Sequence, residues 1–345
     1  MRRLLLLLFL LLIYAAGTAR ADVRVLLYHR VGDGRYPTTN VSLESFRAEM
    51  IWLKDNGYKV VSTAALEEYL LRGGKLPEKA VVIQFDDGLR SVYTTALPVL
   101  REFGYPFSIF VTTEPVEKGY PDYVTWGMLE EMVKAGGEIG VHGHSHQRMA
   151  GPARGEDMET FRKRMAFELL EPKRLLEKRG LASVWFAYTF GEYGPDLVAA
   201  TRAAGYRLGF VQDPGAVDAE SDPFLLNRYA VVGSVAEMGL FKERMTYGAL
   251  HLTDRLPQYG AAETDSPVVY SAKILNPERY IPNTVNVFVS ELGKLETSYD
   301  AATGVVTCRG GKKLGNYLNR VIVTIKERIT GKYALGSWAI ITGKY

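Results

Sequence analysis

The feature that most constrains this chain is a repeated pairing of an amphipathic helical stretch with a short apolar strand. Between Asp22 and about Gly248, the helical stretches end at glycines and strand-like runs follow within a few residues. Glycine suits such ends because it adopts the left-handed backbone conformation without steric cost. The expected strands are 23–28, 58–61, 80–85, 107–111, 138–141, 183–187 and 207–211. Strands alternating with helices favour an α/β fold with a mostly parallel sheet, and we expect a barrel rather than an open sheet.

A different pattern begins after about residue 250, where helical spacing disappears. Strand-like runs occupy 268–274, 284–290, 305–308, 320–327 and 337–342, separated by turn residues. This pattern is typical of a small all-β sandwich. We therefore expect a barrel domain at 22–250, a linker at 251–267 and a sandwich-like accessory domain at 268–345.

The N-terminus has the pattern of a secretory signal peptide at residues 1–21. Two arginines precede an apolar run from Leu4 to Ile13, and Ala19-Arg20-Ala21 provides small residues at the expected cleavage point. A signal anchor is the alternative, but the apolar run is shorter than the roughly 18–20 residues that span a bilayer. We expect cleavage before Asp22, a periplasmic or secreted protein, and no stable transmembrane span after processing.

Charge and cysteine content exclude several classes of function. The chain has 42 basic and 39 acidic residues, and because residues 1–21 carry three arginines and no acid, the remaining chain has 39 of each. Nucleic acid is therefore not an expected partner, because its recognition normally needs a basic face. Cys308 is the only cysteine, which excludes an intramolecular disulfide and a Cys-x-x-Cys metal or redox site.

Two adjacent carboxylates, Asp86 and Asp87, come directly after the expected strand 80–85 and precede Gly88. The carboxyl end of a strand is where α/β folds gather their sites. Like charges this close raise one pKa, and a cation bound by one carboxylate removes that cost and leaves the other free as a base. Taken alone, the tripeptide Asp86-Asp87-Gly88 is more typical of a solvated turn.

Three of the five histidines of the chain lie in the sequence His142-Gly143-His144-Ser145-His146, after the expected strand 138–141. Imidazoles at i and i+4 can bind one ion, with metal to nitrogen distances of about 2.0–2.1 Å, while His144 points elsewhere. A solvated polar loop is the alternative. One carboxylate and two imidazoles leave positions open for water and substrate, which is the pattern of a catalytic site and predicts metal-assisted hydrolysis.

Three stretches, 26–31, 85–88 and 138–146, resemble the polysaccharide deacetylase family, also called the NodB-homology or carbohydrate esterase family 4 domain. The resemblance covers 23–232, with the two motifs in the family's order. It implies a distorted (β/α) barrel that removes N-acetyl groups from β-linked N-acetylglucosamine polymers. By position it also implies that Asp86 is the general base, and that one divalent ion, Zn²⁺ or a similar ion such as Co²⁺, Ni²⁺ or Fe²⁺, has the following ligands: Asp87, His142 and His146.

Two departures from the family pattern concern the groups around the base. Where the family commonly has Arg-x-Pro-Tyr or Arg-x-Pro-Phe, this chain has Ala187 and Thr189 at the arginine and proline positions. Arg228 is a candidate replacement, and an ordinary ion-pairing arginine is the alternative. The late Leu-x-x-His motif has no clear counterpart, because His251 falls in the expected linker. Such departures resemble the branch of the family that modifies exopolysaccharides, including poly-N-acetylglucosamine deacetylases.

Several further residues are candidates for substrate binding. An aromatic face stacks on the apolar face of a sugar ring, and His29 ends the first strand. The candidates are His29, Tyr188, Phe190, Tyr193 and Arg228. The expected function is a metal-dependent polysaccharide N-deacetylase acting on an N-acetylglucosamine-containing glycan. Two alternatives are a glycan-binding protein on a deacetylase scaffold without turnover, and a hydrolase of acetyl esters that uses the same site.

Overall fold

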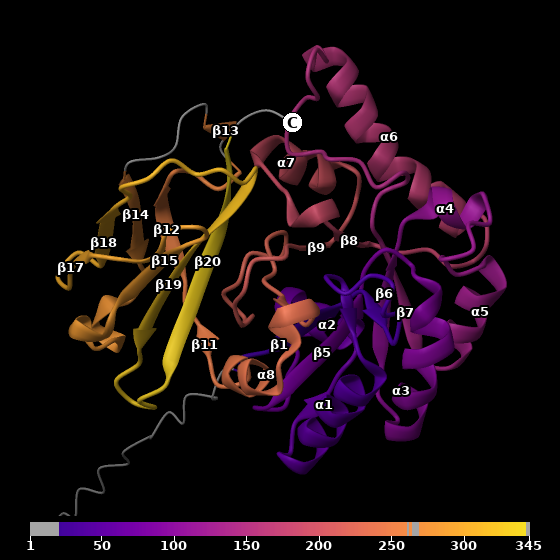
Figure 1. Ribbon diagram of the computed structural model, residues 1–345, viewed down its shortest axis with the longest axis horizontal. Coiled ribbons are helices and arrows are strands. Elements are labelled where there is room, and N and C mark those ends of the chain that lie inside the picture. Colours follow the sequence, from indigo (N-terminus) through magenta and orange to yellow (C-terminus); the bar gives the residue numbers. More distant parts are fainter. Residues whose placement is uncertain (1–20, 261, 264–268, 343–345) are drawn as a thin grey trace, which may run out of the picture.

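The computed structural model describes residues 21–260, 262–263 and 269–342, which form an α/β domain and an all-β domain side by side (Figure 1). The expected signal segment lies outside the described residues except for Ala21. Within the described ranges, no helix is both long enough and apolar enough to cross a membrane.

The α/β domain is built on a parallel sheet with the strand order β10-β1-β5-β6-β7-β8-β9, in which β4 also pairs with β5. The buried strands are largely apolar on both faces, as the sequence predicts, because one face packs against the helices and the other lines the interior of the domain. The strands are β1 (Arg24–Tyr28), β4 (Lys59–Val60), β5 (Ala80–Phe85), β6 (Phe107–Val111), β7 (Gly137–Val141), β8 (Trp185–Ala187), β9 (Leu208–Phe210) and β10 (Tyr229–Ala230). A separate short pair joins β2 (Arg30–Val31) to β3 (Asn40–Val41).

One segment, Leu226–Ala230, connects the two ends of this sheet, and we call it the closing segment. Leu226 exchanges backbone hydrogen bonds with Gly209 and Val211 at β9, while β10 pairs with β1. The sheet therefore curls into a distorted barrel, as expected. Arg228 lies in the middle of the closing segment and is fully buried.

Helices cover the outside of the sheet, and their ends follow ordinary capping chemistry. Ser42, Ser62, Thr125 and Asp157 accept a backbone N–H at the starts of α1, α2, α5 and α6, which satisfies donors that the first turn leaves free. The helices are α1 (Leu43–Asp55), α2 (Thr63–Arg72), α3 (Leu97–Phe103), which continues a helical turn η1 (Val92–Ala96), α4 (Thr113–Glu117), α5 (Trp126–Lys134), α6 (Met158–Glu177), α7 (Pro195–Ala203) and α8 (Met238–Arg244). Short helical turns follow at η2 (Thr189–Gly191) and η3 (Gly233–Ala236).

The C-terminal domain is a sandwich of two sheets with a shared apolar core, which confirms the expected all-β architecture. One sheet has the order β11-β20-β19-β15-β16 with β13 beside β20, and the other has the order β12-β14-β18-β17. The strands are β11 (Gly248–Ala249), β12 (Leu252–Leu256), β13 (Ala262–Glu263), β14 (Val269–Ile274), β15 (Asn286–Val289), β16 (Gly293–Leu295), β17 (Thr297–Asp300), β18 (Val305–Arg309), β19 (Leu318–Lys326) and β20 (Tyr333–Thr342), with turns at η4 (Pro277–Arg279) and η5 (Pro282–Thr284).

The expected linker at 251–267 needs correction, because it contains β12, which pairs with β14 in the sandwich. Leu252 is buried in the sandwich core, whereas Thr253 and Asp254 face solvent. The polar residues of this edge strand made it resemble a connecting loop in the sequence. Residues 264–267 of the expected linker lie outside the described residues.

Candidate active site

The carboxylates and histidines that the sequence singles out lie together at the carboxyl ends of β5 and β7. Asp87 Oδ1 is 3.4 Å from His142 Nε2 and 3.3 Å from His146 Nε2. The two stretches are some 55 residues apart in the chain, and β6 separates their strands in the sheet. The fold therefore brings one carboxylate oxygen and two imidazole nitrogens to one point, as the sequence predicts.

The spacing of these three atoms fits a divalent ion. Two ligands of a tetrahedral ion at about 2.0–2.1 Å lie about 3.3–3.4 Å from each other, which is the spacing found between these atoms. Asp87 Oδ1 and His142 Nε2 are buried and have no hydrogen-bond partner among the described residues. Buried polar atoms are normally satisfied, so two such atoms facing each other fit a cation between them.

Further hydrogen bonds and neighbouring charges fix the orientation and the protonation state of these side chains. His142 is buried, and its Nδ1 lies 2.8 Å from the carbonyl oxygen of Ala187, so Nδ1 carries the proton and Nε2 offers its lone pair. Burial lowers the pKa of His142, but Asp86 and Asp87 outweigh it and raise that pKa. Burial likewise raises the pKa of Asp87, yet His142 and His146 hold it well below its ordinary value. Asp87 is therefore a carboxylate, the form that binds cations.

Asp86 lies beside this cluster, where Arg228 holds it. The Arg228 nitrogens Nη1 and Nη2 donate to Asp86 Oδ1 and Oδ2 at 2.8 and 2.7 Å, and both side chains are fully buried. Arg228 Nε donates to the carbonyl oxygen of Val211, which fixes the orientation of the Arg228 guanidinium. Burial raises the pKa of Asp86, but Arg228 and His142 outweigh it and lower that pKa. Asp86 Oδ2 lies 4.0 Å from His142 Nε2, so an ionised carboxylate stands beside the candidate metal site.

A glutamate that no sequence motif singles out supports the loop His142–His146, which we call the metal loop. Glu168 on α6 is buried, and its carboxylate accepts the backbone N–H groups of His144 and Ser145 and the Ser145 hydroxyl. His144 turns away and bonds Thr113 Oγ1 through Nδ1, as expected. The signal for Glu168 is its position on the apolar face of α6, in line with Phe161 and Met165.

Two of the candidate substrate residues border the site. The Phe190 ring packs against His146 with 4.4 Å between ring centroids, and Phe190 is half-buried. His29, at the end of β1, is held uncharged by burial, which lowers its pKa although Asp87 and Asp86 oppose the shift. Its Nδ1 is buried and has no hydrogen-bond partner among the described residues. Both positions are compatible with substrate contact.

The other three candidates have different roles. Tyr188 is fully buried, and its hydroxyl donates to the carbonyl oxygen of Phe224. Tyr193 is buried between the domains, and its hydroxyl donates to Asp213. Arg228 is bound to Asp86 and does not reach solvent. The sequence places these residues after strands but does not show which way each side chain points. Burial leaves the three side chains no open face for a sugar, whereas the candidate role of Arg228 as the replacement for the family's arginine fits its pairing with Asp86.

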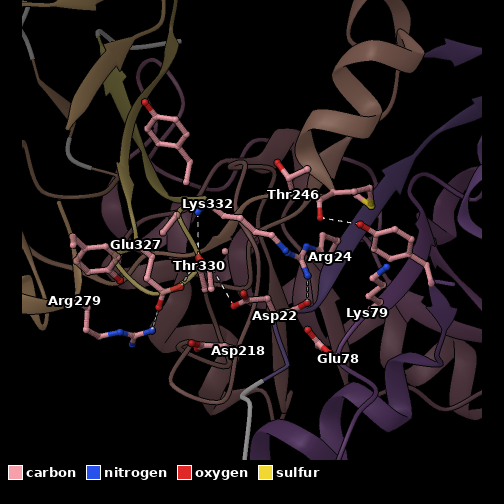
Figure 2. Close-up of a pocket in the computed structure, with 17 residues that line it drawn as sticks. Asp22, Arg24, Glu78, Lys79, Asp218, Thr246, Arg279, Glu327, Thr330 and Lys332 are labelled. Atoms are coloured by element: carbon pink, nitrogen blue, oxygen red, sulfur yellow. Dashed lines mark hydrogen bonds and ion pairs between the residues drawn. The ribbon is translucent and has the colours of Figure 1, made fainter. Parts of the chain in front are cut away.

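Other hollows and clusters lie away from this site. A cavity of about 300 Å³ between the domains is lined by Asp22, Arg24 and Lys79 from the amino ends of the strands and by Glu327 and Lys332 from the C-terminal domain (Figure 2). It faces the end of the barrel opposite to Asp86 and Asp87. A second carboxylate and histidine group, Asp218, Glu220 and His251, is already hydrogen-bonded internally, with His251 Nε2 3.0 Å from Asp218 Oδ2.

At its sheet edge the barrel carries one carboxylate and two histidines with a second, ionised carboxylate beside them, an arrangement suited to hydrolysis. Comparison with known proteins agrees with the resemblance that the sequence indicates. Residues 73–209, within the α/β domain, match the profile described as polysaccharide deacetylase, so this domain is similar to the polysaccharide deacetylase family.

Individual relatives agree with this assignment. YxkH of Bacillus subtilis, whose name places it among polysaccharide deacetylases, is 27% identical over 212 residues, covering 61% of this chain and 72% of that protein. A poly-beta-1,6-N-acetyl-D-glucosamine N-deacetylase of Staphylococcus aureus is 27% identical over 199 residues, covering 56% and 68% of the two chains. The solved structure of IcaB from Ammonifex degensii is similar with a TM-score of 0.55 and 27% identity, covering 62% of this chain and 94% of that one.

Proposed function

We propose that this protein hydrolyses the N-acetyl groups of a polysaccharide that contains N-acetylglucosamine, with one divalent ion and Asp86 as general base. The observation that carries the proposal is the meeting of Asp87, His142 and His146 at 3.3–3.4 Å beside the ionised carboxylate of Asp86. The similarity to an N-deacetylase that acts on poly-beta-1,6-N-acetyl-D-glucosamine supports the substrate class.

Asp87, His142 and His146 would hold the ion, and Zn²⁺ suits a set of one oxygen and two nitrogen ligands. Bound there, a divalent ion lowers the pKa of water and polarises a carbonyl oxygen. The chain's own contribution is to keep these ligands in the required protonation states. Ala187 fixes the tautomer of His142, and the two imidazoles keep Asp87 ionised.

Asp86 would take the proton of the attacking water and Arg228 would keep Asp86 ionised for that task. A general base must be unprotonated before the reaction and must stand within hydrogen-bond reach of the water. Arg228 satisfies the first condition by its paired hydrogen bonds, and it also fixes the carboxylate plane. The role that the family commonly gives to an arginine near Ala187 is thus available from the closing segment.

Phe190 and His29 would border the acetylated sugar. Phe190 is half-buried beside His146, so that part of its ring is free to meet an apolar sugar face. His29 carries an unpaired buried nitrogen next to both aspartates. We further propose that the protein acts outside the cytoplasm after removal of residues 1–21, in keeping with the signal-peptide pattern of its sequence.

The test is acetate release from N-acetylglucosamine oligomers by the full chain, with Zn²⁺, after chelation, and after Zn²⁺ is restored. We expect release that chelation abolishes and Zn²⁺ restores. Asp86→Asn should lower kcat by about 10²–10⁴-fold while Zn²⁺ still binds, as expected for loss of a general base. Asp55→Asn, an exposed aspartate at the end of α1, serves as the matched control and should retain full activity.

Two other outcomes would replace this proposal. Acetate release from O-acetylated sugars but not from N-acetylated oligomers would identify an ester hydrolase that uses the same site. Stoichiometric Zn²⁺ with glycan binding and no acetate release from either substrate would identify a glycan-binding protein.

A further inference from the structure

The C-terminal domain contacts the active-site region through residues 317–320, at the start of β19. Tyr317 is fixed to the sheet by its carbonyl oxygen, which accepts the backbone N–H of Thr342 at 2.8 Å. Arg320, three residues on, pairs with Ala339 of β20. Both side chains reach the barrel domain, and they reach it at two different places.

Tyr317 contacts the metal-loop side of the site. The Arg148 guanidinium lies 4.9 Å from the Tyr317 ring centroid and 4.5 Å from that of Phe190, so it is enclosed between the two rings. Phe190 in turn packs on His146 at 4.4 Å. Arg148 also pairs with the buried carboxylate of Glu192, which holds the guanidinium in place. An unbroken row of side chains therefore runs from the C-terminal domain to His146.

His146 is the candidate metal ligand that most needs this support. Its side chain is 30% exposed against 1% for His142, and its backbone has a positive φ of 58°, which is unfavourable for a residue other than glycine. The Nδ1 of His142 is fixed by a backbone carbonyl, whereas the His146 ring packs against the rings of His142 and Phe190. Phe190 also has a positive φ, of 59°, so its position depends on packing.

Arg320 contacts the base side of the site. Its Nε donates at 2.9 Å to Oδ1 of Asp213, a fully buried residue after β9. The Asp213 carbonyl oxygen accepts the backbone N–H of Arg228 at 3.0 Å. Asp213 Oδ2 is bound by Tyr193, whose hydroxyl oxygen accepts the N–H of Ala339 from β20. The closing segment, which carries the arginine that orients Asp86, is thus tied to the C-terminal domain.

We propose that Tyr317 and Arg320 are positioning residues for the active site, so that the C-terminal domain is part of the catalytic apparatus. Tyr317 holds His146 through the stacked Arg148 and Phe190 side chains. Arg320 holds Asp86 through the closing segment. The role of Arg320 rests on the function proposed above, whereas the role of Tyr317 is measurable as metal affinity alone.

The experiment compares full-length variants with matched controls in the same domain. Tyr317→Ala is set against Tyr299→Ala, a partly buried tyrosine of β17, and Arg320→Met against Arg309→Met, an exposed arginine of β18. Zn²⁺ affinity is measured by competition with a chromogenic chelator, and kcat and KM by acetate release from N-acetylglucosamine oligomers. The thermal unfolding midpoint of each variant is also recorded, so that a loss of Zn²⁺ affinity or of kcat can be separated from a loss of stability.

We expect Tyr317→Ala to weaken Zn²⁺ binding by roughly tenfold, the lower end of what loss of a ligand-orienting group causes. Tyr317→Phe keeps the ring and should restore wild-type affinity. Arg320→Met should lower kcat by roughly tenfold with KM unchanged, and Arg320→Lys should recover most of it. Both controls should match the wild type.

The inference is overturned if Tyr317→Ala binds Zn²⁺ as tightly as Tyr299→Ala does and Arg320→Met turns over as fast as Arg309→Met. It is equally overturned if all four variants lose affinity and rate alike, because that result indicates general weakening of the sandwich. Absence of acetate release by the wild type would refute the proposed function, while the Zn²⁺ comparison would still decide whether Tyr317 supports the metal loop.

Discussion

The pair formed by Asp86 and Arg228 allows a quantitative test of how the barrel holds its base. Both side chains are 0% exposed and are joined by two hydrogen bonds of 2.7 and 2.8 Å. Removing one partner of such a pair leaves an uncompensated buried charge, which costs about 3–5 kcal/mol. We therefore expect Arg228→Met to destabilise the protein by that amount, which corresponds to a fall in Tm of roughly 6–20 °C for a domain of this size.

The double variant Asp86→Asn/Arg228→Met should be less destabilised than the sum of the two single variants, because it leaves no unpaired charge. We expect a coupling free energy of about 2–3 kcal/mol in a double-mutant cycle measured by denaturant unfolding, with chelator present throughout. The control cycle uses Arg47 and Glu102, which form the same two-bond arrangement on the surface with side chains 43% and 54% exposed.

That exposed pair should show a coupling of only about 0.2–1 kcal/mol, because water and salt screen it. If the buried pair is no more strongly coupled than the surface pair, Arg228 does not compensate the charge of Asp86. A different group would then have to keep the Asp86 carboxylate ionised.

Three further predictions concern stability and metal binding. Burial raises the pKa of Glu49 to about 8, so the folded state keeps a proton that the unfolded state releases above its ordinary value of 4.5. The free energy of unfolding of the wild type, relative to that of Glu49→Gln, should therefore fall between about pH 5 and pH 8 by roughly 1.4 kcal/mol per pH unit. A difference between the two proteins in urea unfolding that does not change with pH would contradict this. Glu168→Gln removes the charge that binds the metal loop and should weaken Zn²⁺ affinity by about 10–100-fold in a chelator competition, and unchanged affinity would show that the loop holds its shape alone. Gly140→Ala would place a Cβ 2.2 Å from the Phe110 ring and should lower the free energy of unfolding by about 1–3 kcal/mol. An unchanged Tm would mean that β6 and β7 move apart to accommodate the methyl group without loss of stability.

Much of the barrel could be predicted because its signals are local. Buried parallel strands are apolar runs, and the expected strands 80–85 and 107–111 coincide with β5 and β6. The candidate metal ligands could be predicted for a related reason, since the carboxyl ends of parallel strands meet at one edge of the sheet. The position of each motif after its strand was enough to predict that one of the two carboxylates meets the two histidines, and the family resemblance singled out Asp87.

What the sequence left open depends on how distant segments close around the site. Arg228 was only one candidate for the missing arginine, because it lies 142 residues from Asp86 and no local pattern shows that the closing segment brings the two side chains together. Tyr188 and Tyr193 follow a strand as Phe190 does, but their rings turn into the protein, and an aromatic residue has no sequence mark for that choice. β12 was missed because its pairing with β14 shifts register between Thr253 and Leu256, so apolar and polar residues do not alternate regularly and the consecutive residues Thr253 and Asp254 both face water.

The arginine on the closing segment also bears on how such chains are classified from sequence. A search for the usual motif finds Ala187 at its arginine position and would place the protein among inactive relatives. In this chain a guanidinium from the closing segment, one residue before β10, bonds the carboxylate of Asp86 instead. A motif-by-motif survey does not see this guanidinium, whereas a spatial criterion, a buried guanidinium within hydrogen-bond distance of the first aspartate, finds it.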